Sequence, residues 1–133
     1  MFVGSCLCRA VKWQIDAVLE QMHHCHCSRC RKARSAAFAT NAVTTIDGVR
    51  FLRSEDNVQL FLLPGAKYFA HAFCKTCGSS MPQKDAARGR HSVPLGCMDD
   101  DLVVRAEHHI FTDSKAPWYA WLGDLPAFAS RSE

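Results

Sequence analysis

The sequence predicts a single, mainly β domain of short strands that spans residues 1–133. Short runs alternate apolar with polar residues, as segment 11–15 does, and this is the period of a half-buried strand. Turn-forming dipeptides such as Asp47-Gly48 separate the runs. A chain of 133 residues has the length of one ordinary domain, and it contains no internal repeat or linker.

The order of these runs predicts the elements along the chain. Strands are expected at 11–15, 37–43, 49–53, 58–63, 67–73, 91–97, 102–105 and 109–112. A helical turn is expected at 28–34 and a second helical segment at 117–122. Gly65 and Gly78 each mark a turn, because Gly adopts positive φ without steric penalty.

The N-terminal residues predict a soluble, cytoplasmic protein. Segment 1–6 has no basic stretch followed by a long apolar run, so it does not resemble a signal peptide. The most apolar stretch, 60–63, is too short to cross a bilayer, and we expect no membrane partner. Under cytoplasmic reducing conditions, closely spaced cysteines indicate metal or redox chemistry rather than disulfides. The net charge of +3 is modest and spread along the chain, so it does not indicate a nucleic-acid partner.

Seven of the eight cysteines fall into three tight groups: Cys6 and Cys8; Cys25, Cys27 and Cys30; and Cys74 and Cys77. Such spacings allow neighbouring sulfurs to converge on one zinc ion, which takes four ligands in a tetrahedron. The two pairs together complete a closed four-thiolate site that ties the N-terminal strand to a hairpin near the middle. The triplet then has three ligands and an open position, which is the pattern of catalytic zinc.

Other side chains of the protein are candidates for the fourth position of the triplet. Cys97 lies in an apolar run and is interpreted as a buried strand residue. His26 stands between two ligands and is expected to point away, while His23 and His24 belong to the strand that leads into the triplet. The open position is therefore the preferred interpretation, and closure by a protein ligand is the alternative.

Basic residues follow the triplet closely: Arg29, Arg31, Lys32 and Arg34. Three thiolates leave a zinc ion with a formal charge of −1, so nearby cations would compensate a further thiolate and grip the carboxylates of a peptide-like thiol. Arg31 is the first candidate because it follows Cys30 directly, with Arg29 and Lys32 beside it. His109 is a candidate for proton handling, since His titrates near neutral pH.

These motifs resemble the glutathione-dependent formaldehyde-activating family, which also includes centromere protein V-like domains. The resemblance rests on GSCLC at 4–8, CHCSRCRK at 25–32, FCKTCGS at 73–79, LG at 95–96, DD at 99–100, HIF at 109–111 and PW at 117–118. Two positions differ from the family pattern. Arg9 stands where the family usually has Gly, and Ser35-Ala36 stands where it commonly has Gly-Ser, so Ser35 is expected to reshape the pocket.

The resemblance implies a β-tent of short antiparallel sheets with two zinc sites. It implies structural ligands at Cys6, Cys8, Cys74 and Cys77, and catalytic ligands at Cys25, Cys27 and Cys30, with the second site only partly occupied. It also implies a carbon–sulfur lyase-type activity in which a small thiol such as glutathione adds to an aldehyde such as formaldehyde. The alternatives are a non-catalytic zinc-binding interaction module and a redox-sensitive zinc protein.

Overall fold

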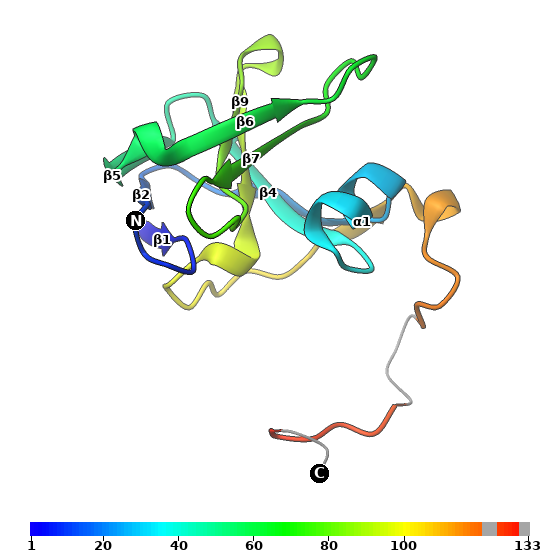
Figure 1. Cartoon of the computed structure of the whole chain (residues 1–133). Coiled ribbons are helices and arrows are strands. Elements are labelled where there is room, and N and C mark those ends of the chain that lie inside the picture. Colours follow the sequence, from blue (N-terminus) through cyan, green and yellow to red (C-terminus); the bar gives the residue numbers. More distant parts are fainter. Residues whose placement is uncertain (121–124, 131–133) are drawn as a thin grey trace.

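The computed structural model describes residues 1–120 and 125–130, which form three short sheets and one α-helix (Figure 1). The first sheet has the order β1–β2–β5, with bounds Phe2–Ser5, Lys12–Ile15 and Val49–Arg53. The second has the order β10–β3–β4–β9–β8, with bounds His108–Ile110, Glu20–Cys25, Ala39–Thr45, Arg90–Pro94 and Gln83–Asp85. The third pairs β6 with β7, with bounds Val58–Leu62 and Ala70–Cys74.

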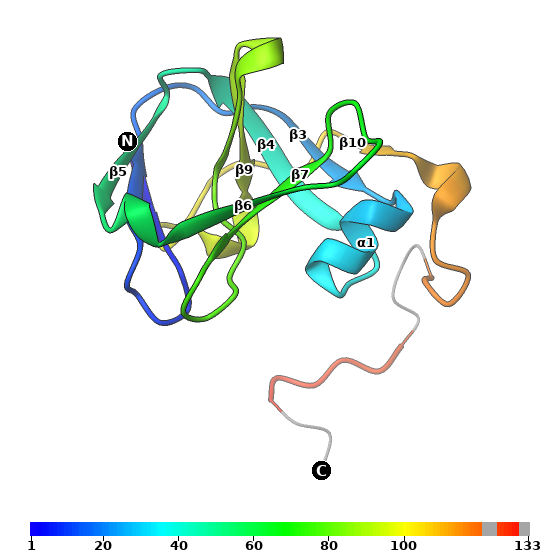
Figure 2. The ribbon, with the colours of Figure 1, turned by 45° about the horizontal axis from the view of Figure 1, so that its top comes forward.

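The helix α1 spans Ser28–Arg34 and connects β3 to β4, so it sits at one end of these two strands (Figure 2). Short 3₁₀ helices occur at Glu55–Asn57, Ala86–Arg88, Leu95–Cys97 and Thr112–Ser114. Within the described residues, no helix is both long and apolar enough to cross a membrane.

The mainly β class predicted from the sequence is confirmed, and several predicted segments coincide with observed elements. β5 and α1 have the predicted bounds, and β2, β4, β6, β7 and β9 lie within the expected runs or shifted by a few residues. Most strand pairs are antiparallel, but β10 lies parallel to β3. That pairing carries the chain beyond residue 107 back to the strand that leads into the cysteine triplet.

Two of the predicted elements are wrong. Segment 102–105 is irregular rather than a strand, because no strand pairs with it, and Val103 is 99% exposed. In the predicted helix 117–122, the described residues 117–120 begin with a turn and contain no helix, while residues 121–122 lie outside the described part. The amide N–H of Tyr119 donates to the carbonyl of Ala116, which closes this turn. Periodicity over four to six residues is too weak to separate such turns from regular structure.

The buried core contains part of the cysteine constellation. Trp13 and Val11 have no exposed surface, and Cys6 and Cys74 pack into the same cluster with exposed fractions of 2% and 0%. Two of the sulfurs are therefore surrounded by the hydrophobic residues that stabilise the fold. Changes at these cysteines will affect packing as well as ligation.

Gly4 is required by the packing of the Trp13 ring against β1. The two residues are directly opposite in the antiparallel register, and a Cβ at residue 4 would lie 2.4 Å from Trp13 Cζ2. We expect Gly4→Ala to destabilise the protein by about 1–3 kcal/mol, since the buried indole must shift. Denaturant unfolding would measure it. Gly96→Ala is the matched control, because nothing lies within 4 Å of a Cβ there and its unfolding should hardly change.

Both residues that replace a family Gly adopt the left-handed backbone conformation, with φ of 62° at Arg9 and 50° at Ser35. Ser35 ends α1, and its backbone N–H points to the carbonyls of Arg31 and Lys32. A non-Gly residue pays a steric cost at such a helix end, and Gly does not. Both turns therefore have the backbone conformation that Gly adopts without steric cost.

We expect Ser35→Gly to stabilise the protein by roughly 1 kcal/mol, because it removes the steric cost of positive φ. Thermal unfolding of the metal-loaded protein would measure the change. Ala33→Gly lies two residues earlier inside α1, where Gly is unfavourable by about 1 kcal/mol, so this control should change stability in the opposite direction. A loss of stability in Ser35→Gly would contradict the explanation.

Candidate metal centres

The first cluster consists of Cys6, Cys8, Cys74 and Cys77, whose sulfurs all lie within 4.8 Å of one another. Cys6 and Cys8 belong to the tight turn after β1, in which the N–H of Arg9 donates to the carbonyl of Cys6 at 2.8 Å. Cys74 ends β7, and the N–H of Gly78 donates to its carbonyl at 2.8 Å. Gly78 has φ of 75°, so the second turn has the positive φ expected from its Gly.

The distances between these sulfurs fit a tetrahedral metal ion and not a disulfide. Cys8 Sγ lies 3.5 Å from Cys6 Sγ and 3.9 Å from Cys74 Sγ. A tetrahedron with metal–sulfur bonds of about 2.3 Å has edges of about 3.8 Å. Bonded sulfurs would instead be about 2.05 Å apart. The cluster can therefore hold a zinc ion without rearrangement of these three sulfurs.

Side chains outside the cluster orient its sulfurs. Asn57 Nδ2 donates to Cys74 Sγ at 3.4 Å and to Thr76 Oγ1 at 3.0 Å. Ser79 Oγ accepts from the N–H of Leu7 at 2.9 Å, which links the two cysteine turns. Such outer partners fix ligand orientation. Sequence reasoning missed Asn57, because nothing in the sequence shows that residue 57 lies beside Cys74.

One cysteine of the first cluster, Cys77, favours the ionised form before any metal binds. Cys77 Sγ lies 3.3 Å from Ser79 Oγ. That hydrogen bond, together with backbone amides, lowers the pKa of Cys77 to about 5 although burial opposes it. A thiolate is the form that ligates zinc. Cys77 therefore need not lose a proton at neutral pH when it binds a metal.

The second cluster consists of Cys25, Cys27 and Cys30. Cys25 ends β3, Cys27 is the N-cap of α1, and Cys30 lies in the first turn of that helix. The backbone N–H of Cys30 donates to Cys27 Sγ at 3.3 Å, so the sulfur takes the role that Ser or Asp oxygens usually have at an N-cap. A strand end and a helix start thus bring the three sulfurs within 4.8 Å of one another.

Two thiols of the triplet, those of Cys25 and Cys30, have pKa values shifted in opposite directions. The hydrogen bond from Cys30 lowers the pKa of Cys25 to about 6, with further contributions from Cys27. The same bond, with burial and the charge of Cys25, raises the pKa of Cys30. Cys25 therefore favours the thiolate form at neutral pH, and metal binding would release the proton of Cys30.

Within residues 1–120 and 125–130, no fourth Cys, His or carboxylate joins the triplet. Cys97 is half-buried and packs against the core cluster. His26 is fully buried in an aromatic group, with its ring centroid 5.1 Å from that of Phe38 and 5.6 Å from that of Tyr119. The donor set thus consists of three thiols, which suits zinc with one further ligand from outside.

His109 lies on the strand next to the one that leads into the triplet, because β10 pairs in parallel with β3. Its Nδ1 is 2.8 Å from Nε2 of His26, and the N–H of His26 donates to the carbonyl of Ile110. Burial, followed by the charge of His109, lowers the pKa of His26, and burial also lowers the pKa of His24. His24 and His26 therefore favour the neutral form, and the ring of His109 lies against both of them.

The three basic residues predicted to bind substrate occupy different environments. Arg29 and Lys32 are exposed on α1, whereas Arg31 is half-buried. The Nε of Arg31 is buried without a hydrogen-bond partner, and the charge of Arg31 contributes to the lowered pKa of His26. Arg31 therefore lies on the histidine side of the triplet.

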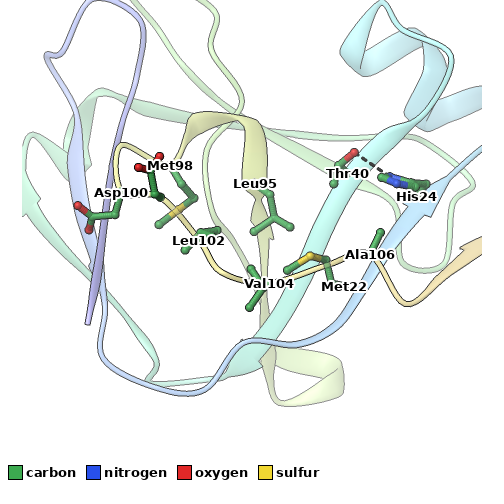
Figure 3. Close-up of a pocket in the computed structure, with 10 residues that line it drawn as sticks. Met22, His24, Thr40, Leu95, Met98, Asp100, Leu102, Val104 and Ala106 are labelled. Carbon is green, nitrogen blue, oxygen red and sulfur yellow. Dashed lines mark hydrogen bonds between the residues drawn. The ribbon is translucent and has the colours of Figure 1, made fainter. Parts of the chain in front are cut away.

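A separate cavity of about 410 Å³ lies between β3, β4 and the irregular segment near residues 100–106 (Figure 3). Its wall includes Met22, Met98 and His24, and His24 Nδ1 lies 2.9 Å from Thr40 Oγ1. None of the clustered cysteines lines it. Because neighbouring strand residues point to opposite faces, His24 faces this cavity and Cys25 the other side of the sheet.

Comparison with known proteins places these centres in a family. The family model described as "Glutathione-dependent formaldehyde-activating enzyme" matches residues 1–114. No curated protein matches the chain. The crystal structure of a Rhodobacter sphaeroides protein is similar, with a TM-score of 0.61 and 23% identity over 76% of this chain and 91% of that one, which shows a shared fold. Since the family match includes both cysteine clusters and most of the sequence, the chain belongs to the glutathione-dependent formaldehyde-activating family.

Proposed function

We propose that the protein is a zinc-dependent carbon–sulfur lyase-type enzyme of the cytoplasm that adds a small thiol, such as glutathione, to an aldehyde, such as formaldehyde. The first cluster would hold a structural zinc ion and the second a catalytic one. The observation that carries the proposal is the convergence of three sulfurs, with no fourth protein ligand among the described residues. That donor set leaves a coordination position for a thiol from solution.

Zinc bound to the triplet would keep an incoming thiol ionised, whereas a free thiol of pKa near 8.5 is only about 3% thiolate at pH 7. This raises the thiolate population by about 30-fold. Nucleophilicity falls together with pKa, so the net gain is under about tenfold. The larger contribution must come from residues that hold the thiol and the aldehyde together.

In the reaction, the thiol sulfur forms a bond to the aldehyde carbon, and the C=O π electrons move to the oxygen, which then takes a proton. His109 Nδ1 lies 2.8 Å from Nε2 of His26, the residue between Cys25 and Cys27, and this pair is proposed to hold or deliver that proton. Arg31, Arg29 and Lys32 are proposed to orient the anionic groups of the thiol, since all three lie on or next to the helix turn that contains Cys30.

The direct test is formation of S-hydroxymethylglutathione from glutathione and formaldehyde, followed by exchange NMR because the uncatalysed reaction also proceeds. The zinc-loaded protein should accelerate exchange above the buffer rate, and the metal-free protein should not. Cys97→Ala is the matched control, because Cys97 belongs to neither cluster and its loss should leave the rate unchanged. Exchange at the buffer rate with fully loaded protein would count against this pair of substrates.

A further inference from the structure

Arg34 is the last residue of α1, and its side chain turns toward the sheet. Its Nη2 donates to Oδ1 of Asn41 at 3.2 Å, and Asn41 is only 7% exposed. Arg29 and Lys32, on the same helix, are exposed. Arg34 is therefore a half-buried cation held in place by a buried amide, unlike its two basic neighbours.

Two independent geometric relations place Arg34 beside the triplet. On α1, Cys30 precedes Arg34 by four residues, so their side chains lie on the same face of the helix. On the sheet, Ala39 is directly opposite Cys25, and Asn41 is two residues further along the same strand. Asn41 therefore shares the sheet face of Cys25. Helix spacing and strand register both direct the guanidinium toward the three sulfurs.

The titratable groups that face Arg34 are two thiols and His71 rather than carboxylates. Burial lowers the pKa of Arg34, and Cys30 and Cys97 act in the opposite direction through their ionised forms. None of the ion pairs in the described part of the chain includes Arg34. A half-buried guanidinium is costly without an anionic partner, so this position favours a negatively charged group.

The guanidinium of Arg34 has more hydrogen-bond donors than the described residues use. It carries five N–H bonds, and the described residues accept only one hydrogen bond from it. The buried nitrogens that lack a partner include Nε of Arg31 but no nitrogen of Arg34. The remaining donors of Arg34 are therefore not fully buried, and the described residues leave them without a partner.

We propose that Arg34 is a specificity-determining residue that binds a carboxylate of the thiol ligated at the triplet. The planar fork of guanidinium matches the two oxygens of a carboxylate. A neutral thiol would leave the half-buried cation without an anion. This inference rests on the proposed function, because it requires a thiol at the fourth coordination position.

The first test needs no variant. The protein is loaded with cobalt(II) in place of zinc, and thiol ligation is followed by visible absorption while glutathione, its diethyl ester or 2-mercaptoethanol is added. We expect glutathione to bind about 10–100-fold more tightly than its diester, which is the range of a hydrogen bond between charged groups. Equal affinity of the acid and the ester would overturn the role of Arg34.

The second test removes the guanidinium. Arg34→Gln should remove most of the preference for glutathione over its diester and change the affinity for the diester by less than about twofold, whereas Arg34→Lys should keep more of the preference. Arg50→Gln makes the same charge change at an exposed position of β5, in another sheet, and should leave the preference intact. Equal weakening of all three thiols in Arg34→Gln would assign Arg34 to the metal site or the fold and overturn the inference.

The outcomes separate this inference from the proposed function. If no thiol changes the spectrum of the cobalt protein, the triplet has no exchangeable position and both proposals fail. If thiols bind but do not differ by their carboxylates, only the role of Arg34 fails. Should Arg34→Gln not fold, Arg34→Lys keeps the charge but loses the planar fork, and the part of the preference that it loses decides.

Discussion

Cys74→Ser is expected to remove the metal from the four-cysteine cluster and to cause a large loss of stability. Cys74 has no exposed surface and packs with Trp13 and Val11, so its ligand bond and its packing are lost together. Structural zinc contributes about 10–16 kcal/mol to the folding of small zinc domains. A typical domain is stable by only about 5–15 kcal/mol. The variant should therefore unfold, or melt far below the unchanged protein.

The measurement combines metal content with thermal unfolding. The unchanged protein should hold a chelator-resistant ion, and chelation strong enough to remove it should lower its unfolding temperature toward that of Cys74→Ser. Cys97→Ser is the matched control, because this half-buried cysteine packs against the same core but belongs to neither cluster. Its metal content should be unchanged. A Cys74→Ser protein that melts like the control would show that the cluster has no structural role.

Local spacing was sufficient to predict both cysteine groups. C-x-C, C-x-C-x2-C and C-x2-C keep neighbouring sulfurs close whatever the surrounding fold, and the structure brings the same residues together. Cys8 and Cys74 are 66 residues apart, so spacing alone does not place their two pairs at one ion. That assignment required the further argument that a tetrahedral ion needs four ligands. The number of ligands that zinc requires thus predicted a long-range contact that the hydrophobic periodicity does not indicate.

The parts that the sequence did not predict depend on contacts between distant segments. The parallel pairing of β10 with β3 brings His109 to His26, and no local pattern encodes that register. Asn57 is a similar case, since it acquires its role from a partner on another element. Arg34 was among the cations predicted from the sequence, but what distinguishes it from Arg29 and Lys32 is its contact with Asn41 on β4. Segment 102–105 has strand-like composition but lacks a partner strand, and pairing decides whether such a run becomes a strand.

Cys27→Ser is expected to abolish activity and remove the second ion while leaving the fold intact. Cys27 Sγ caps α1 by accepting from the N–H of Cys30, and a Ser hydroxyl is a favourable acceptor at an N-cap. Its hydroxyl is not a thiolate ligand, so affinity for zinc should fall by more than about 100-fold, because loss of an outer partner alone costs 10–100-fold. Glutathione–formaldehyde exchange should then fall to the buffer rate.

Cys27→Ser and Cys74→Ser make the same chemical change in different clusters. Their comparison therefore separates a catalytic role from a structural one. Cys27 is only half-buried and lies outside the hydrophobic core, so thermal unfolding of Cys27→Ser should stay close to that of the unchanged protein. One chelator-resistant ion should remain, held by the four-cysteine cluster. If Cys27→Ser keeps its catalytic activity with that single ion, the reaction does not take place at the triplet. If it melts at as low a temperature as Cys74→Ser, the triplet has a structural role as well.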